Sequence, residues 1–126
     1  MLMFTLELQR RADKNGWNLR SVAAHPGWAR TDIIGNGIGS GGPSIRARVA
    51  EAAFNFVAQP AKDAALPVLF AAIAPEAKGG SYYGPSDWGE TRGAPGKSKI
   101  SPQARDPVAA ERLWALSEKL TGQVAS

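Results

Sequence analysis

The strongest restriction on the fold comes from a short apolar run at residues 19–24, which stops abruptly at Pro26-Gly27. Proline removes a backbone donor, and glycine permits a tight turn that another molecule can approach closely. The pattern therefore predicts a β-strand over residues 18–25 with a sharp exit. In open α/β sheets, ligands bind at the carboxyl ends of parallel strands. The turn after this strand is consequently the first candidate for a binding site.

Helices are predicted on both sides of this strand. Residues 1–14 place apolar side chains at three- and four-residue spacings, and Asn15-Gly16 supplies a carboxyl cap. The first turn of this helix is apolar on all sides, which predicts burial all round. The predicted helices cover residues 1–14, 44–58, 60–75 and 106–122.

Prolines mark the later helices. Pro60 is a favourable first-turn residue, while Pro67 must kink the helix or lie in its early turns. Asp106-Pro107 has the order of an N-cap followed by the first helical residue, and Gly122 ends this last helix.

The order of strands and helices predicts an α/β fold. A second short strand is expected at residues 81–83, and residues 86–105, rich in Gly, Pro, Ser and Lys, are expected to form an exposed loop. The chain would then contain about two strands and four helices, the strands belonging to a parallel sheet. Two strands are too few for a parallel sheet covered on both faces. Residues 1–126 are therefore interpreted as a single partial domain.

Composition excludes several classes of protein. The 126 residues carry a net charge of +4, but the basic residues are dispersed and lack interleaved aromatic residues, so no nucleic-acid partner is expected. No apolar run approaches the roughly 20 residues needed to span a membrane. The sequence has no Cys and one His, which disfavours disulfides and a metal site and fits a cytoplasmic protein.

Four motifs, taken in order, resemble the carboxyl-terminal half of a short-chain dehydrogenase/reductase of the retinol-dehydrogenase-like kind. Residues 3–11 resemble the helix that carries the catalytic Lys of that family at its beginning. Residues 25–31, His-Pro-Gly-Trp-Ala-Arg-Thr, fit the P-G-x-x-x-T turn of the family. Residues 79–85 resemble its last core strand, and residues 112–122 resemble its closing helix.

The resemblance implies a Rossmann-type doubly wound parallel sheet, of which this chain would supply the carboxyl-terminal portion. The complete parent would be an oxidoreductase that uses NAD or NADP to interconvert a hydrophobic alcohol and its carbonyl compound. Pro26, Gly27, Trp28 and Thr31 would form the cofactor-binding turn, with Thr31 bonding the carboxamide or the phosphates of the cofactor.

The resemblance also implies what these residues lack. Family members use a Ser and a Tyr-x-x-x-Lys pair, whereas Ser86 and Asp87 stand four residues after Tyr82 and Tyr83. The catalytic Lys would align just upstream of Met1, so no catalytic residue is assigned and the chain alone is expected to be inactive.

Three further features suggest a functional site, but their sequence context disfavours each of them. Residues 37–42 match G-x-G-x-x-G, but they lack the flanking strands of a dinucleotide fingerprint. Gly96-Lys97-Ser98 resembles the end of a P-loop, but Thr91 stands where the first Gly is required. His25 lacks an evident partner for general-base work, and its position in the resembled family is structural.

Residues 33–58 would overhang the active site of the parent and shape substrate choice, although the substrate itself is not predicted. Some apolar side chains of this segment either line that site or face the core: Ile33, Ile34, Ile38, Phe54, Phe56 and Val57.

Two functional hypotheses remain open. The first is a truncated oxidoreductase. The second is a non-catalytic interaction module whose first helix pairs with a missing amino-terminal half or with a second copy, giving a homo-oligomer.

Overall fold

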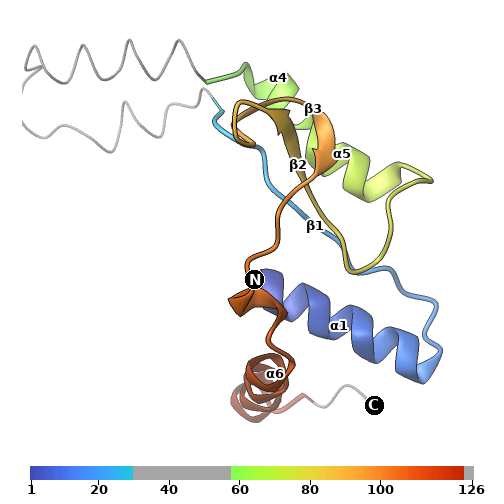
Figure 1. The fold of residues 1–126 in the computed structure, drawn as a ribbon. Coiled ribbons are helices and arrows are strands. Elements are labelled where there is room, and N and C mark those ends of the chain that lie inside the picture. The colour runs from blue at the N-terminus through green and yellow to red at the C-terminus, as the bar shows by residue number, and fades with distance from the viewer. Residues whose placement is uncertain (30–57, 124–126) are drawn as a thin grey trace, which may run out of the picture.

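The computed structural model describes residues 1–29 and 58–123. These residues form a three-stranded sheet in the order β1-β2-β3, with short helices packed on it and two longer helices packed against each other (Figure 1). Strand β1 (Ala23–Ala24) runs parallel to β2 (Tyr82–Asp87), and β3 (Arg92–Lys97) runs antiparallel to β2. The predicted α/β fold with a parallel strand pair is therefore confirmed.

Strand β1 is shorter than the run at 18–25 suggested, but its pairing extends beyond its two residues. The amide of Ala23 donates to the carbonyl of Ser81 at 3.0 Å, and the amide of His25 donates to Tyr83 at 2.9 Å. At the other end, the amide of Gly80 donates to the carbonyl of Ser21 at 2.8 Å. These bonds bring the carboxyl ends of β1 and β2 to the same edge of the sheet.

The segment over 86–105 differs from the single loop that was expected. Strand β3 and a short 3-10 helix, η1 (Gln103–Arg105), lie within it, although none of its residues is buried. A tight turn makes the β2–β3 hairpin possible, because Trp88, Gly89 and Glu90 all have positive φ values, of 51°, 66° and 67°. Strand β3 lies at the sheet edge, where a proline such as Pro95 is tolerated. Backbone pairing with β2 therefore outweighs the turn-like composition.

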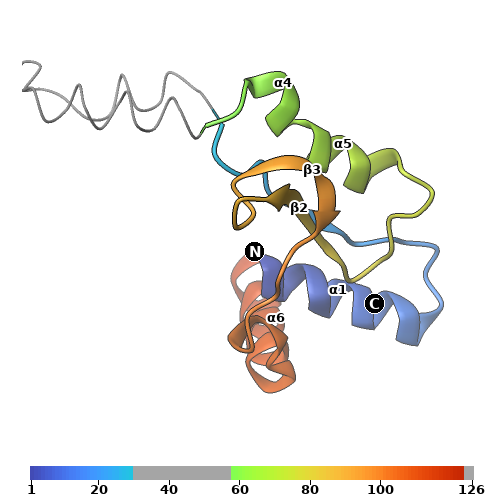
Figure 2. The same cartoon turned by 45° about the horizontal axis from the view of Figure 1, so that its top comes forward.

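Helices α1 (Leu2–Asn15) and α6 (Pro107–Thr121) lie side by side in Figures 1 and 2. Their caps confirm the sequence prediction: Gly16 and Gly122 end the helices in left-handed conformations, with φ values of 67° and 68°. The Asp106 side chain accepts from the amides of Val108 and Ala109 at the start of α6.

Aromatic stacking holds α1 against α6. The rings of Phe4 and Trp114 stack with centroids 4.7 Å apart, and the Arg11 guanidinium lies 4.6 Å from the centre of the Trp114 ring. Arg11 and Arg10 also contact the buried carboxylate of Glu7, each at 2.7 Å. Burial of the first turn is less complete than the sequence suggested, because Met1 is fully exposed.

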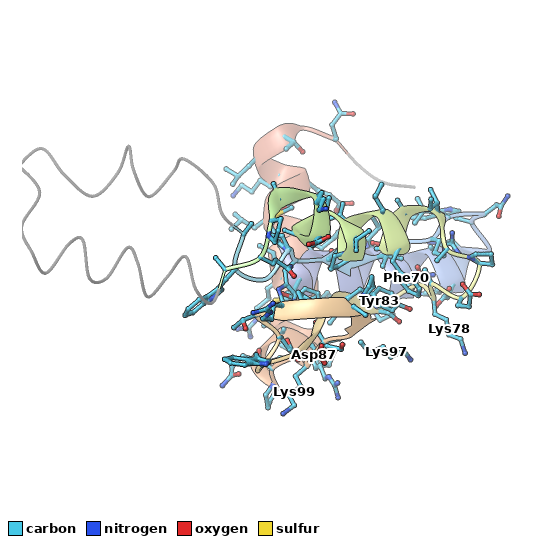
Figure 3. All side chains as sticks on the ribbon, turned by 90° about the horizontal axis from the view of Figure 1, so that it is seen from above. Phe70, Lys78, Tyr83, Asp87, Lys97 and Lys99 are labelled. Atoms are coloured by element: carbon cyan, nitrogen blue, oxygen red, sulfur yellow. The ribbon has the colours of Figure 1, made fainter. Side chains whose placement is uncertain are left out.

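Helices α4 (Ala61–Ala64) and α5 (Leu66–Ile73) replace the single helix predicted over 60–75. The break falls at Ala65, two residues before Pro67, which lies buried in the first turn of α5, one of the two places the sequence allowed. Helix α5 packs on the sheet, where the ring of Phe70 lies 5.1 Å from that of Tyr83 (Figure 3). The glycine-rich motif at 37–42 and nearly all of the helix expected at 44–58 lie outside the described residues.

A search of the described residues for a helix long and apolar enough to cross a membrane gives no candidate.

Candidate functional site

The turn at Pro26–Gly27–Trp28 follows directly from the carboxyl end of β1. Gly27 has a φ of +67°, a conformation that L side chains rarely adopt. A Cβ atom at this position would meet the carbonyl of Thr91 and would lie 2.7 Å from Cγ of Pro85. The glycine is therefore required both by the backbone conformation and by the close approach of the β2–β3 hairpin.

Hydrogen bonds within the chain fix this turn on several sides. The amide of Trp28 donates to the carbonyl of Thr91 at 2.8 Å, and the carbonyl of Trp28 accepts from the amide of Gln59 at 2.8 Å. The side-chain amide of Gln59 donates to the carbonyl of Pro26 at 2.9 Å. The amide of Gly27 donates to Nδ1 of His25 at 3.2 Å. The shape of the turn is thus set by protein contacts.

His25 joins the turn to the β2–β3 hairpin. Because Nδ1 accepts a hydrogen bond from the amide of Gly27, the neutral ring carries its proton on Nε2. Nε2 lies 2.9 Å from Oγ of Ser98 and 3.6 Å from a carboxylate oxygen of Glu90. A base that activates a serine needs an unprotonated nitrogen facing the hydroxyl. The arrangement therefore positions the ring and does not form a Ser-His-Glu triad, which agrees with the structural reading of His25.

The two tyrosines lie in β2 but in different environments. Burial, and secondarily the carboxylate of Glu90, raises the pKa of Tyr82. The pKa of Tyr83 is lowered, chiefly because its hydroxyl oxygen accepts from the amide of Lys78 at 3.0 Å. Figure 3 shows Tyr83 facing α5, beside Phe70. Tyr83 is therefore part of the packing between the sheet and α5.

The other predicted site residues divide into two groups. Thr31, residues 33–57 and the glycine-rich stretch 37–42 lie outside the described residues. Gly96 and Lys97 belong to β3 and pair with Gly84 and Tyr83 of β2, which agrees with rejecting a P-loop at this position. The described residues hold no group of three or more His, Asp or Glu side chains able to bind a metal ion.

Gln59 is the residue of this site that sequence reasoning missed. It is only 4% exposed and makes contacts to both the turn and β3. It lies between the helices predicted over residues 44–58 and 60–75 and had no role assigned to it. A buried glutamine has no periodic signature, so the sequence pattern contained no signal for this role.

Together, the parallel pair β1/β2, its flanking helices and the tight turn at the carboxyl end of β1 define part of a Rossmann-type α/β fold. Comparisons with known proteins agree. The chain is 33% identical over 119 residues to the short chain dehydrogenase/reductase dpfgH of Gibberella zeae, covering 93% of this chain and 31% of that protein. It is 32% identical over 124 residues to human Retinol dehydrogenase 13, covering 97% of this chain and 34% of that protein.

A solved structure supports the same fold. The crystal structure of an uncharacterized protein from Mycobacterium Paratuberculosis matches with a TM-score of 0.64 and 33% identity, over 97% of this chain and 35% of that one. No protein-family model matches the sequence. The resemblance to short-chain dehydrogenase/reductases is thereby confirmed, for a chain that spans about a third of the length of those relatives.

Proposed function

We propose that these 126 residues are the carboxyl-terminal part of an NAD(P)-dependent oxidoreductase that acts on a hydrophobic alcohol or carbonyl compound. The observation that carries the proposal is the Pro26-Gly27 turn at the carboxyl end of β1, in a sequence similar to short-chain dehydrogenase/reductases over nearly its whole length. Parallel α/β sheets bind ligands at this edge.

Pro26, Gly27, Trp28 and Thr31 would form the nicotinamide side of the cofactor site. When bound, NAD(P) supplies the hydride-transfer chemistry. The backbone of the described part of the turn would hold the turn in shape. Its polar groups, the amides of Gly27 and Trp28 and the carbonyls of Pro26 and Trp28, already form hydrogen bonds within the protein. The Trp28 side chain is 50% exposed. In this proposal, the Trp28 side chain and the Thr31 hydroxyl are the parts of the turn that contact the cofactor.

The proton-transfer residues of the reaction would belong to the rest of the parent. The family uses a Tyr-x-x-x-Lys pair, and neither Tyr82 nor Tyr83 is followed by Lys at that spacing. Burial raises the pKa of Tyr82, and the Tyr83 hydroxyl accepts a hydrogen bond from the amide of Lys78. These 126 residues alone are therefore expected to lack oxidoreductase activity. The absence of Cys supports a cytoplasmic location for the parent.

A second candidate, an interaction module, is favoured by the exposed apolar surface. Large apolar side chains on α5 and α6 remain open, including Ile73 and Leu120, each 76% exposed. Strand β1 also lies at an edge of the sheet. The sequence assigns the partner, the amino-terminal half of the parent or a second copy of the chain, to the first helix. The exposed apolar side chains lie instead on α5 and α6.

A chimera tests the proposal. These 126 residues would replace the matching segment of the short chain dehydrogenase/reductase dpfgH, and NAD(P)H oxidation would be followed with a panel of hydrophobic aldehydes and ketones. A chimera whose catalytic Tyr is changed to Phe serves as the inactive control. We expect the chimera to bind NAD(P)H and turn over, and the 126 residues alone to do neither.

Three outcomes would count against the proposal. Turnover by the 126 residues alone would contradict the assignment of catalysis to the rest of the parent. A folded chimera that does not bind NAD(P)H would contradict the cofactor assignment. Stable association of the isolated chain with itself, without cofactor binding in the chimera, would favour the interaction module.

A further inference from the structure

We propose that Gln59 is a positioning residue that ties the Pro26–Trp28 turn to the β2–β3 hairpin, so that the hairpin sets the shape of the turn. The functional consequence, control of the cofactor side of the site, rests on the function proposed above. The structural link itself does not depend on that function.

The geometry of Gln59 carries the inference. Its backbone amide donates to the carbonyl of Trp28 at 2.8 Å, and its side-chain Nε2 donates to the carbonyl of Pro26 at 2.9 Å. Its side-chain Oε1 accepts from the amide of Gly93 in β3 at 3.2 Å. One side chain therefore bonds the turn with its donor and the hairpin with its acceptor.

Burial makes this arrangement demanding. Gln59 is 4% exposed, so water does not readily replace the partners of its amide. Losing one partner leaves a buried polar group unsatisfied, which costs more than the hydrogen bond itself contributes. Only a side chain with a donor and an acceptor on one short fork can satisfy both Pro26 and Gly93.

The hairpin side of the link is held in place by close packing. Gly93 has a φ of +109°, and a Cβ atom there would lie 2.8 Å from Cγ of Asp87. Thr91 adds a second connection, since its carbonyl accepts from the amide of Trp28 at 2.8 Å. The turn is thus bonded to the hairpin directly through Thr91 and indirectly through Gln59. A displacement of residues 91–93 therefore has to displace the turn.

Replacing Gln59 with glutamate gives a test with an internal rescue. At neutral pH the carboxylate of Gln59→Glu keeps an acceptor for Gly93 but has no proton for Pro26, and two oxygens then face each other. Protonation of the new carboxyl, whose ordinary pKa is about 4.3, restores the donor. The measurement is amide hydrogen exchange by NMR on the 126-residue chain, expressed as protection factors so that the intrinsic pH dependence of exchange is removed.

In Gln59→Glu at neutral pH, we expect repulsion between the new carboxylate and the Pro26 carbonyl to move the side chain away from both partners. Protection of the Trp28 and Gly93 amides should then fall about tenfold or more and be regained on acidification. Gln59→Leu, which has neither donor nor acceptor, should show the loss without the rescue. Gln9→Glu is the matched control: Gln9 also accepts from a backbone amide, that of Ser21 at 2.7 Å, and donates to a carboxylate, that of Asp13, but it lies on α1. This control should leave protection at Trp28 and Gly93 unchanged.

Unchanged protection at Trp28 and Gly93 in Gln59→Glu would overturn the proposal. An equal loss in Gln9→Glu would overturn it as well, because the effect would then reflect overall stability. In an active chimera, Gln59→Glu should raise KM for the cofactor more than it lowers kcat. Exchange decides the role of Gln59 even if the chimera is inactive, so failure of the proposed function is distinguishable from failure of this link.

Discussion

Replacing Gly27 with alanine should destabilise the protein more than the same change at Gly16. Both glycines have a φ of +67°, so both substitutions impose the same left-handed backbone on an alanine. Their surroundings differ. A Cβ atom at Gly16 meets nothing within 4 Å, whereas one at Gly27 collides with the Thr91 carbonyl and with Pro85. The pair therefore separates the conformational cost from the packing cost.

The expected sizes follow from those two costs. Holding a residue with a Cβ atom in the left-handed region costs about 1–2 kcal/mol. Forcing an extra methyl group into a filled space costs about 1–3 kcal/mol. Gly16→Ala should thus lower the free energy of unfolding by about 1–2 kcal/mol, and Gly27→Ala by about 2–5 kcal/mol.

Urea denaturation followed by tryptophan fluorescence measures both values, since the chain contains four Trp residues. The comparison requires equal m-values for the two variants, which shows that the unfolding transition is unchanged. Gly122→Ala provides a repeat of the control, because Gly122 has a φ of +68° and open space around it. If Gly27→Ala costs no more than Gly16→Ala, the close contact between the turn and the hairpin is wrong.

Four further substitutions test the α1–α6 contact, the Glu7 ion pairs within α1 and the two tyrosines. Trp114→Ala removes a side chain that is only 5% exposed and stacks on an aromatic neighbour, so urea denaturation should show a loss of about 3–5 kcal/mol. The hydrogen bond from Arg10 is the main cause of the lowered pKa of Glu7 in the folded protein. The ionised Glu7 therefore stabilises the fold above the unfolded-state pKa of about 4.3. This stabilisation is lost as the pH falls through the lower folded-state pKa. Glu7→Gln should accordingly flatten the fall in stability with acid, and an unchanged acid slope would contradict the ion pair. In an alkaline titration followed by tyrosinate absorbance, Tyr83 should ionise before Tyr82, so Tyr83→Phe should remove the earlier step and Tyr82→Phe the later one.

Elements with local signals were predictable from sequence. Gly16 and Gly122 end helices through conformations that glycine adopts readily, and Asp106 caps α6 with its own side chain. Pro67 lies in an early turn of its helix, one of the two positions that its missing amide and restricted φ allow. Each of these effects acts within one turn of the chain, which is why pattern reasoning found them.

Elements that depend on contacts with another segment of the chain were not predictable in the same way. Strand β3 is formed by its pairing with β2, although its sequence, Arg-Gly-Ala-Pro-Gly-Lys, resembles a loop. Gln59 obtains its role from Pro26 and Gly93, which lie more than thirty residues away on either side. Neither contact leaves a trace in local composition or periodicity.

A cofactor site needs a correctly shaped turn and a complete domain around that turn. The local geometry of the turn is supported inside this chain, because Gly27, Trp28 and Gln59 make hydrogen bonds and close contacts with His25, Pro26, Pro85 and Thr91. Completion of the domain is a different matter, since β1 lies at a sheet edge and apolar side chains on α5 and α6 are exposed. A turn that is already shaped before binding reduces the ordering cost of ligand association. Under the proposed function, the rest of the parent would add the pyrophosphate contacts and the catalytic residues to a turn already held by bonds within the described residues.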